Sequence, residues 1–386
     1  MGEEQLRVVH LAAYGGAYTG SFIPMMQAAR RAVESRGWAF ETVFSSGAER
    51  YPWHGALRES GFPTRVAPAL GRGAAVPWTR ELLDERQGPT LLHTHFSQWD
   101  VPAVLAGRRH RDTAVVWHLH TRLEDDTAAV LRNAVRFGSF GRLTDRILCV
   151  APQIREKAVR RLAPARRTEV LTNGIDVSRF APPPAQARLK RRSETRERLG
   201  VPQDRTVLLM FAWDWETKGG ELLLETVREL RARSRDVHAV IVGSQDTAQS
   251  EARVRGVEDL VHPIGPVQDT PALYGAVDLF IAGSVAEGMP FSLLEAVAAG
   301  TPVLASDIPG HRFAARSLPA CRLAPRLPGA FADAIEAEIA ADDNDRERRL
   351  AQSRTWIEQE LSLSSWSQRL GEVYDSVASR RRWGVR

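Results

Sequence analysis

The sequence predicts an α/β protein built from two doubly wound parallel-sheet domains. The chain has 386 residues, which is more than a single hydrophobic core usually holds. Short apolar runs alternate with amphipathic helical segments along its length, as expected for parallel strands joined by crossover helices. A proline-rich linker at 181–185 separates two such arrays. We therefore expect one domain at 1–182, a second at 183–365, and a last helix at 366–386 that crosses back to the first domain.

The first array starts with a strand, a glycine-rich turn and a helix. Its expected strands lie at 6–13, 40–44, 64–67, 89–93, 114–121, 145–150 and 169–171. The turn contains Gly15 and Gly16, and the helix after it begins at Ser21. Glycine lets a ligand approach the backbone closely, so this turn is a candidate part of a binding site. A tight turn without a ligand is the alternative interpretation.

Histidines gather where two strands of the first array end. His93 and His95 close one strand, and His118 and His120 close the next. We expect His93, His95 and His120 to face one rim, because the carboxyl ends of parallel strands meet at the same edge. A His-x-His pair can bind zinc, but zinc normally needs a third ligand and supporting outer contacts. The sequence shows no such set, so we expect no metal, and His118 is interpreted as a hydrogen-bonded strand residue.

The second array opens with a continuous apolar strand at 206–212, as required of a parallel strand that is buried on both faces. Further strands are expected at 237–242, 259–264, 277–282, 302–305 and 321–323. Lys218 precedes the helix that follows the first of these strands. Ser292 and Glu295 have the spacing of a capping box, which predicts that another helix begins near Ser292.

The loop at 283–291 follows a strand, at the edge where open α/β sheets bind ligands. The N-terminus of the next helix favours a phosphate there, and Lys218 could neutralise a diphosphate. Glu287 and Glu295 would repel phosphate, so we expect them to accept hydrogen bonds from hydroxyl groups. Phosphates together with hydroxyls predict a nucleotide sugar as the ligand.

Glu287 and Glu295, followed by a small-residue helix and Gly-x-Pro-Val, resemble the E-x7-E signature of retaining glycosyltransferases with the GT-B fold. The closest resemblance is to family 4, also called glycosyltransferase group 1. It implies two Rossmann-like domains that face a central cleft. The run at 172–180 resembles the hinge segment of that family. One departure is Trp213, which stands where the family usually has an arginine that binds the leaving phosphates.

The resemblance implies a role for each matching residue. Catalytic roles fall on Glu287, His120 and Lys218. Donor binding falls on Gly16, Asp214, Lys218, Val267, Met289, Phe291, Ser292, Leu293 and Glu295. The acceptor side comprises Gly15, Gly16, His95 and Asn173. The implied reaction is a retaining, metal-independent transfer of a hexosyl group from a UDP- or GDP-type sugar to a hydroxyl of a small or lipid-linked acceptor, with no cofactor.

Composition narrows the remaining possibilities. The chain has 52 basic and 47 acidic residues, a net charge of +5, and no nucleic-acid-binding motif. No apolar run has the length of a membrane span, and no signal peptide is recognisable, so we expect a cytoplasmic protein. Its arginine excess allows peripheral contact with the inner face of the membrane. A nucleotide-sugar 2-epimerase of the same fold, or a catalytically silent subunit that binds or regulates, stays open as an alternative.

Overall fold

The computed structural model describes residues 5–15, 20–71, 73–85 and 87–383, which form two compact units. Unit 1 comprises Met1–Gly174 and Leu363–Arg386, and unit 2 comprises Ile175–Ser362. The sequence places the boundary at 182, whereas the proline-rich segment packs within unit 2. Pro182 Cγ, for example, lies 3.6 Å from where a Cβ on Gly300 would be. None of the helices in the described residues is both long and apolar enough to cross a bilayer.

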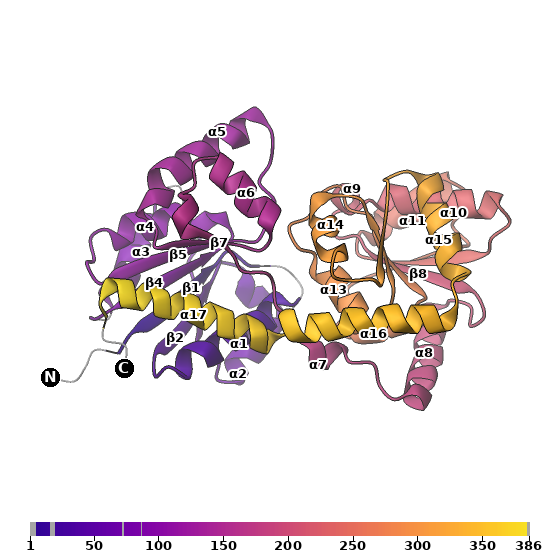
Figure 1. Cartoon of the computed structure of the whole chain (residues 1–386), viewed down its shortest axis with the longest axis horizontal. Coiled ribbons are helices and arrows are strands. Elements are labelled where there is room, and N and C mark those ends of the chain that lie inside the picture. Colours follow the sequence, from indigo (N-terminus) through magenta and orange to yellow (C-terminus); the bar gives the residue numbers. More distant parts are fainter. Residues whose placement is uncertain (1–4, 16–19, 72, 86, 384–386) are drawn as a thin grey trace. The chain divides into compact units, whose positions relative to one another are not determined.

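The described part of unit 1 holds a seven-stranded parallel sheet with the order β3-β2-β1-β4-β5-β6-β7. Its strands are β1 (Arg7–Ala12), β2 (Ala39–Phe44), β3 (Thr64–Val66), β4 (Thr90–His95), β5 (Thr113–Leu119), β6 (Arg146–Cys149) and β7 (Thr168–Val170). Its helices are α1 (Phe22–Glu34), α2 (Pro52–Glu59), α3 (Ala75–Asp84), α4 (Asp100–Gly107), α5 (Thr127–Val135), α6 (Pro152–Arg160) and α17 (Leu363–Arg381). Helices α1 and α17 lie on one side of the sheet, and α3 and α4 lie on the other (Figure 1).

The C-terminal helix α17 is an integral part of unit 1. It packs beside α1, where Arg36 Nε and Nη2 each donate to a carboxylate oxygen of Asp375 at 2.8 Å. Gly174 makes room for this helix, because a Cβ there would lie 2.6 Å from Trp366 Cβ. Close approach, and not a left-handed turn, therefore explains the glycine that follows Asn173.

The described part of unit 2 holds a six-stranded parallel sheet with the order β10-β9-β8-β11-β12-β13. Its strands are β8 (Thr206–Phe211), β9 (Val237–Val242), β10 (Val261–Ile264), β11 (Leu279–Ala282), β12 (Val303–Ser306) and β13 (Cys321–Ala324). Its helices are α7 (Val177–Phe180), α8 (Ala185–Leu199), α9 (Trp215–Lys218), α10 (Gly220–Ala232), α11 (Gln245–Val254), α12 (Thr270–Ala276), α13 (Phe291–Ala298), α14 (Pro309–Ala315), α15 (Pro328–Ile339) and α16 (Asp343–Glu360). The polar helix α11 is absent from the sequence analysis, because it buries only Ala248 and Ala252.

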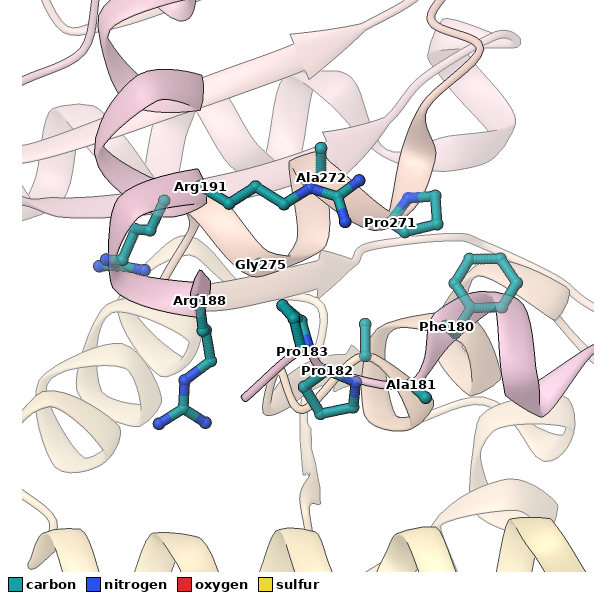
Figure 2. Close-up of a pocket in the computed structure, with 11 residues that line it drawn as sticks. Phe180, Ala181, Pro182, Pro183, Arg188, Arg191, Pro271, Ala272 and Gly275 are labelled. Carbon is teal, nitrogen blue, oxygen red and sulfur yellow. The ribbon is translucent and has the colours of Figure 1, made fainter. Parts of the chain in front are cut away.

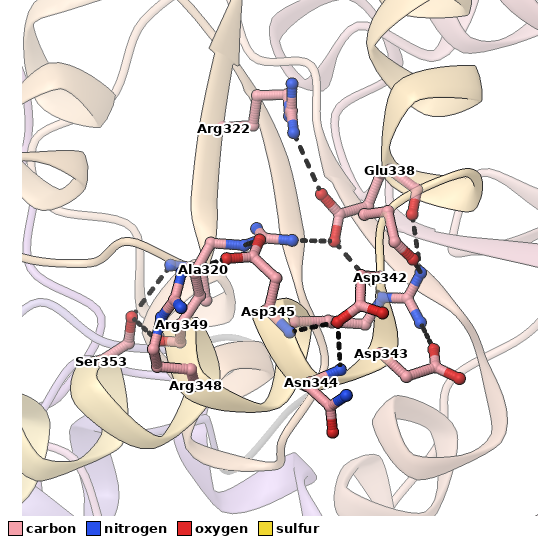
Figure 3. Close-up of polar contacts among 12 residues, drawn as sticks. Ala320, Arg322, Glu338, Asp342, Asp343, Asn344, Asp345, Arg348, Arg349 and Ser353 are labelled. Atoms are coloured by element: carbon pink, nitrogen blue, oxygen red, sulfur yellow. Dashed lines mark hydrogen bonds and ion pairs between the residues drawn. The ribbon is translucent and has the colours of Figure 1, made fainter.

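A buried carboxylate joins α15 to α16. The Glu338 side chain is 6% exposed and accepts a 2.8 Å hydrogen bond from Arg349, while Arg322 and Arg346 lie 3.5 Å away (Figure 3). This pairing raises the pKa of Arg349, chiefly through the hydrogen bond to Glu338. The charged helix α16 is therefore anchored within unit 2 by its arginines.

Candidate functional site

Helix α13 begins at Phe291, one residue from the predicted start, but the predicted capping box is wrong. Pro290 occupies the N-cap position, and no side chain caps the helix. Ser292 lies inside the first turn, and the Glu295 carboxylate is directed into the unit, where only 8% of the residue is exposed. The capping box fails because Glu295 takes a tertiary partner, Tyr274 on α12, that the local spacing does not reveal.

Tyr274 on α12 fixes the position of the Glu295 side chain on α13. Its hydroxyl lies 3.1 Å from Glu295 Oε2 and 3.1 Å from the carbonyl oxygen of Ser292. Burial, together with the charge of Glu295, raises the pKa of Tyr274 well above its usual value, so the phenol stays protonated and donates. Glu295 is therefore a fixed acceptor in the first turns of α13.

Lys218 and Glu287 meet where the loops after β8 and β11 come together. Lys218 Nζ lies 2.6 Å from Glu287 Oε1, which also accepts a 2.8 Å hydrogen bond from Ser284. Gly219 permits this approach, because its φ is +80° and a Cβ there would lie 2.3 Å from the carbonyl oxygen of Gly283. The side chains of Lys218 and Glu287 are 29% and 16% exposed, so both charges stay within reach of a ligand.

The other predicted donor residues follow strands of the same sheet. Asp214 caps α9 and accepts a 3.1 Å hydrogen bond from the Thr217 backbone, and Val267 lies in the loop after β10. Met289 and Leu293 are buried, so their side chains are not available to a ligand. The structure thus brings Lys218 together with Glu287, and Glu295 together with Tyr274, after the paired strands β8 and β11.

Trp213 stands where the family usually has an arginine, so an aromatic ring takes the place of a cation there. Its ring stacks on Phe211 with an interplanar angle of 13°, and a Cβ on Gly243 would lie 2.2 Å from it. Trp213 is 38% exposed. Another cation, Arg326, lies near the loop that follows β11. Its Nε donates a 3.2 Å hydrogen bond to the carbonyl oxygen of Gly283 in that loop.

Unit 1 contains a cluster of five histidines, four on the adjacent strands β1, β4 and β5 and one, His120, directly after β5. The register pairs His10 with His93 and His95 with His118. His10 Nδ1 lies 2.8 Å from His95 Nε2, and His95 Nδ1 lies 2.9 Å from His120 Nε2. His10 could not be recognised from the sequence as a member of this cluster, because it lies inside β1 and only the sheet order places it beside the other histidines.

Burial keeps the cluster neutral. It lowers the pKa of His10 and His118 to about 3 and that of His93, His95 and His120 well below the usual value, with further lowering of most of them by neighbouring histidines. His118 is fully buried, and neither of its ring nitrogens has a hydrogen-bond partner in the described residues, so its interpretation as a hydrogen-bonded strand residue is wrong. The nearby Leu171 backbone raises the pKa of His118 against the larger effect of burial.

Tyr374 on α17 reaches this cluster. Its hydroxyl lies 2.6 Å from His93 Nδ1 and 3.0 Å from His10 Nε2. The sequence around Tyr374 predicts only a helix that crosses back to the first domain. The local pattern contains no signal for this contact, since 281 residues separate Tyr374 from His93.

Two triplets of described histidines bring their ring nitrogens within 4.8 Å of one another, namely His10, His93 and His95, and His95, His118 and His120. Zinc–nitrogen bonds of about 2.0–2.1 Å in a tetrahedral site would keep ligand nitrogens about 3.3 Å apart. The 2.8 and 2.9 Å separations within the cluster are those of hydrogen-bonded imidazoles instead.

His120 also lines a pocket of unit 1 with a volume of about 490 Å³. Arg122, Arg132 and Arg136 contribute positive charge to this pocket, and Arg136 pairs with the fully buried Asp100. The remaining acceptor-side residues have different surroundings. Asn173 is buried near His120 and raises the pKa of that ring against the larger effect of burial. His95 is buried within the cluster, Gly15 is exposed after β1, and Gly16 lies outside the described residues.

A smaller pocket of about 30 Å³ lies in unit 2 between the segment 181–183 and helices α8 and α12 (Figure 2). Pro182, Pro183 and Pro271 form much of its apolar lining, and Arg188 and Arg191 lie at its edge. A void of this size holds about one water molecule, so we regard it as a feature of packing.

Two family models match the chain. The model described as Glycosyltransferase Family 4 matches residues 27–179, and that described as Glycosyl transferases group 1 matches residues 205–340. A GDP-mannose-dependent alpha-(1-6)-phosphatidylinositol monomannoside mannosyltransferase of Mycolicibacterium smegmatis is 34% identical over 46% of this chain and 47% of its own length. A D-inositol 3-phosphate glycosyltransferase 2 of Catenulispora acidiphila is 30% identical over 45% and 43%. The chain thus spans about half the length of the curated relatives it matches.

Solved structures match over nearly the whole chain. HepE of Anabaena in complex with UDP has a TM-score of 0.80 at 20% identity, covering 96% of this chain and 100% of that one. WaaG, a glycosyltransferase involved in lipopolysaccharide biosynthesis, has a TM-score of 0.67 at 15% identity, covering 95% and 99%. These likenesses show the fold, which is GT-B. Since the two family models match its two units and the fold is the one expected, the chain belongs to glycosyltransferase family 4.

Proposed function

We propose that this protein transfers a hexosyl group from a nucleoside diphosphate sugar to an acceptor hydroxyl. The observation that carries the proposal is the ion pair of Lys218 and Glu287 between the loops that follow β8 and β11, with α13 beginning a few residues after Glu287. A bound diphosphate would take over the Lys218 ammonium. Glu287 would then be released to accept hydrogen bonds from hydroxyls of the transferred sugar.

The nucleoside part of the donor would bind around α13. Glu295, held by Tyr274, would accept hydrogen bonds from the ribose hydroxyls, and the uncapped N-terminus at Phe291 would face the phosphates. The relatives support a UDP or GDP donor, since one is named as GDP-mannose-dependent and HepE was solved with UDP.

Arg326 would supply the second cation that the family places at the position of Trp213. Its guanidinium is exposed and lies beside Gly283, whose backbone adjoins the Lys218–Gly219 turn. A guanidinium can bind phosphate oxygens in bidentate fashion, which Lys218 cannot do. The two cations together would stabilise the charge that develops on the leaving diphosphate.

Transfer would proceed with retention of the anomeric configuration and without a metal ion, as the family resemblance implies. With the donor bound, Glu287 would accept hydrogen bonds from Ser284 and from the sugar hydroxyls, so no protein base is assigned. A leaving phosphate oxygen would take the acceptor proton on the face from which it departs. The protein would contribute positioning and charge stabilisation.

The arginine-lined pocket beside His120 would bind the acceptor. Arg122 and Arg132 suit an anionic molecule, and the names of the relatives include phosphatidylinositol and inositol phosphate acceptors. Helix α5 exposes 66% of Leu131 and 52% of Val135 next to this pocket. A lipid-linked acceptor, reached by peripheral contact with the inner face of the membrane, fits this combination of apolar and basic side chains.

The test is a binding screen with UDP, GDP and ADP and their hexose conjugates, followed by transfer assays. We expect one base to bind preferentially and the anomeric proton of the product to show retention by NMR. Activity should persist in EDTA. Binding of none of these nucleotides, or an inverted product, would contradict the proposal.

A catalytically silent binding subunit is the second candidate, and Trp213 at the arginine position favours it. Tight donor binding without turnover on any acceptor would support that alternative. Incubating the donor alone separates a third outcome, since a 2-epimerase would alter the donor sugar without an acceptor.

A further inference from the structure

A continuous hydrogen-bonded chain links helix α17 to His120 through the interior of unit 1. The Tyr374 hydroxyl lies 2.6 Å from His93 Nδ1 and 3.0 Å from His10 Nε2. His10 Nδ1 lies 2.8 Å from His95 Nε2, and His95 Nδ1 lies 2.9 Å from His120 Nε2. The chain therefore connects a buried phenol to a residue that lines the arginine-bearing pocket.

The hydrogens available on the five side chains allow two arrangements of donors and acceptors along this series of hydrogen bonds. Each neutral imidazole carries one N–H and one bare nitrogen, and the phenol has a single hydrogen to donate. If Tyr374 donates to His93, then His10, His95 and His120 all carry their hydrogen on Nε2. If Tyr374 donates to His10, all three carry it on Nδ1, and so does His93.

His93 distinguishes the two directions. Its Nε2 is buried and has no hydrogen-bond partner among the described residues. Donation from Tyr374 to His93 would put a hydrogen on that nitrogen and add a second buried N–H without a partner to the one on His118, whereas such groups are rare in proteins. The reverse direction leaves only a bare lone pair there. His93 Nδ1–H therefore donates to Tyr374, which donates to His10.

The direction set at His93 fixes the far end of the hydrogen-bonded chain. His95 Nδ1–H donates to His120 Nε2, so the hydrogen of the neutral His120 ring lies on Nδ1.

We propose that Tyr374, His10, His93 and His95 are positioning residues that hold His120 as the Nδ1–H tautomer, a hydrogen-bond donor of fixed direction. The proposal rests on the proposed function in one respect, namely that an oxygen of the transferred sugar accepts this hydrogen bond. His120 then orients a sugar oxygen and cannot take a proton at Nδ1. Its role in transfer is that of a donor, not a general base.

The direct test is nitrogen-15 NMR of the histidine-labelled full chain without substrate. We expect His10, His93, His95 and His120 to show a protonated Nδ1 and a bare Nε2. This result is diagnostic because an isolated neutral histidine favours the opposite tautomer. A protonated Nε2 in His120 would overturn the proposal. So would stoichiometric binding of added zinc chloride with loss of these ring N–H signals, which would make the cluster a metal site.

The functional test compares Tyr374→Phe with Asp375→Asn. The first removes the hydroxyl from the chain, and the second weakens the Arg36 contact that docks the same helix but leaves the chain intact. We expect Tyr374→Phe to lower kcat about tenfold with an unchanged KM for the donor and to give mixed tautomers at His120. Asp375→Asn should change neither.

Equal losses in both variants, or an unchanged His120 tautomer in Tyr374→Phe, would reduce Tyr374 to a packing role and overturn the proposal. The NMR result does not depend on turnover. If the NMR spectra show Nδ1–H in all four histidines but the protein has no transfer activity, the proposed function is refuted while the positioning of His120 is supported.

Discussion

Lys218 and Glu287, 69 residues apart in the chain, form an ion pair with Nζ and Oε1 separated by 2.6 Å. Each residue follows a different strand, and the two strands are neighbours in the sheet of unit 2. The pair neutralises two charges that a ligand with both phosphates and hydroxyls would separate. Its two members are therefore expected to act in the same step.

We predict that Lys218→Ala or Glu287→Ala lowers turnover roughly 100-fold or more, because loss of one such charge contact typically costs about 2.7–4 kcal/mol of barrier. The measurement is kcat with the donor identified by the binding screen. Lys190→Ala is the matched control, since the Lys190 side chain is 79% exposed on α8, and its activity should be unchanged. Near-native turnover of either site variant would argue against the assignment.

Arg326→Ala is expected to weaken nucleoside diphosphate binding about tenfold, since hydrogen bonds to charged groups contribute about 1.5–3 kcal/mol. Isothermal titration calorimetry with the preferred diphosphate measures the change. Arg312→Ala provides the control, because Arg312 is an exposed arginine of the same unit that pairs with Asp307. Equal affinities for Arg326→Ala and the parent protein would leave Lys218 as the cation responsible.

Unit 1 should lose stability in mild acid. The pKa of His10 and of His118 falls from 6.5 to about 3 on folding, so the unfolded chain binds more protons between these values. The stabilisation is complete above pH 6.5 and is lost as the pH falls below it. Each such histidine contributes about 1.4 kcal/mol per pH unit in that window.

Urea unfolding between pH 7.5 and 5 would measure this slope. Below the unfolded pKa of 6.5, the variant His10→Asn should show a slope that is smaller by up to about 1.4 kcal/mol per pH unit, because one proton fewer is taken up on unfolding. A stability that does not change between pH 7 and 5 would mean that the histidines are not buried as neutral rings.

Two glycines with left-handed backbones should respond differently to alanine. Gly200 has φ +65° and open space around a Cβ, so Gly200→Ala is expected to cost about 1–2 kcal/mol. Gly219 has φ +80°, and its Cβ would lie 2.3 Å from the Gly283 carbonyl oxygen. Gly219→Ala should therefore destabilise unit 2 more and weaken donor binding, as measured by thermal unfolding and titration. Equal effects would contradict the close loop contact.

Much of the fold can be predicted from the sequence, because buried parallel strands and amphipathic helices have recognisable local patterns of apolar residues. The continuous apolar run at 206–212 indicates a strand buried on both faces, and β8 occupies Thr206–Phe211. Helix α11 could not be predicted in this way, since it buries only two alanines and has no apolar stripe to detect.

The capping box at Ser292 and Glu295 shows where local reasoning fails. The spacing is right for a cap, but Tyr274 binds the carboxylate within the unit instead. Spacing along a helix constrains which side chains can meet within that helix. It carries no information about a phenol contributed by another helix.

The sequence by itself determined the order of the strands and of most helices, the glycosyltransferase resemblance and the placement of Lys218 and Glu287 after strands. Tertiary structure alone decided that these two side chains pair and that Tyr374 joins His10 and His93 inside unit 1. The physical reason is that periodicity reports which face of an element is buried. The order of strands in the sheet and the packing of a distant helix decide which polar groups on that face form hydrogen bonds with one another.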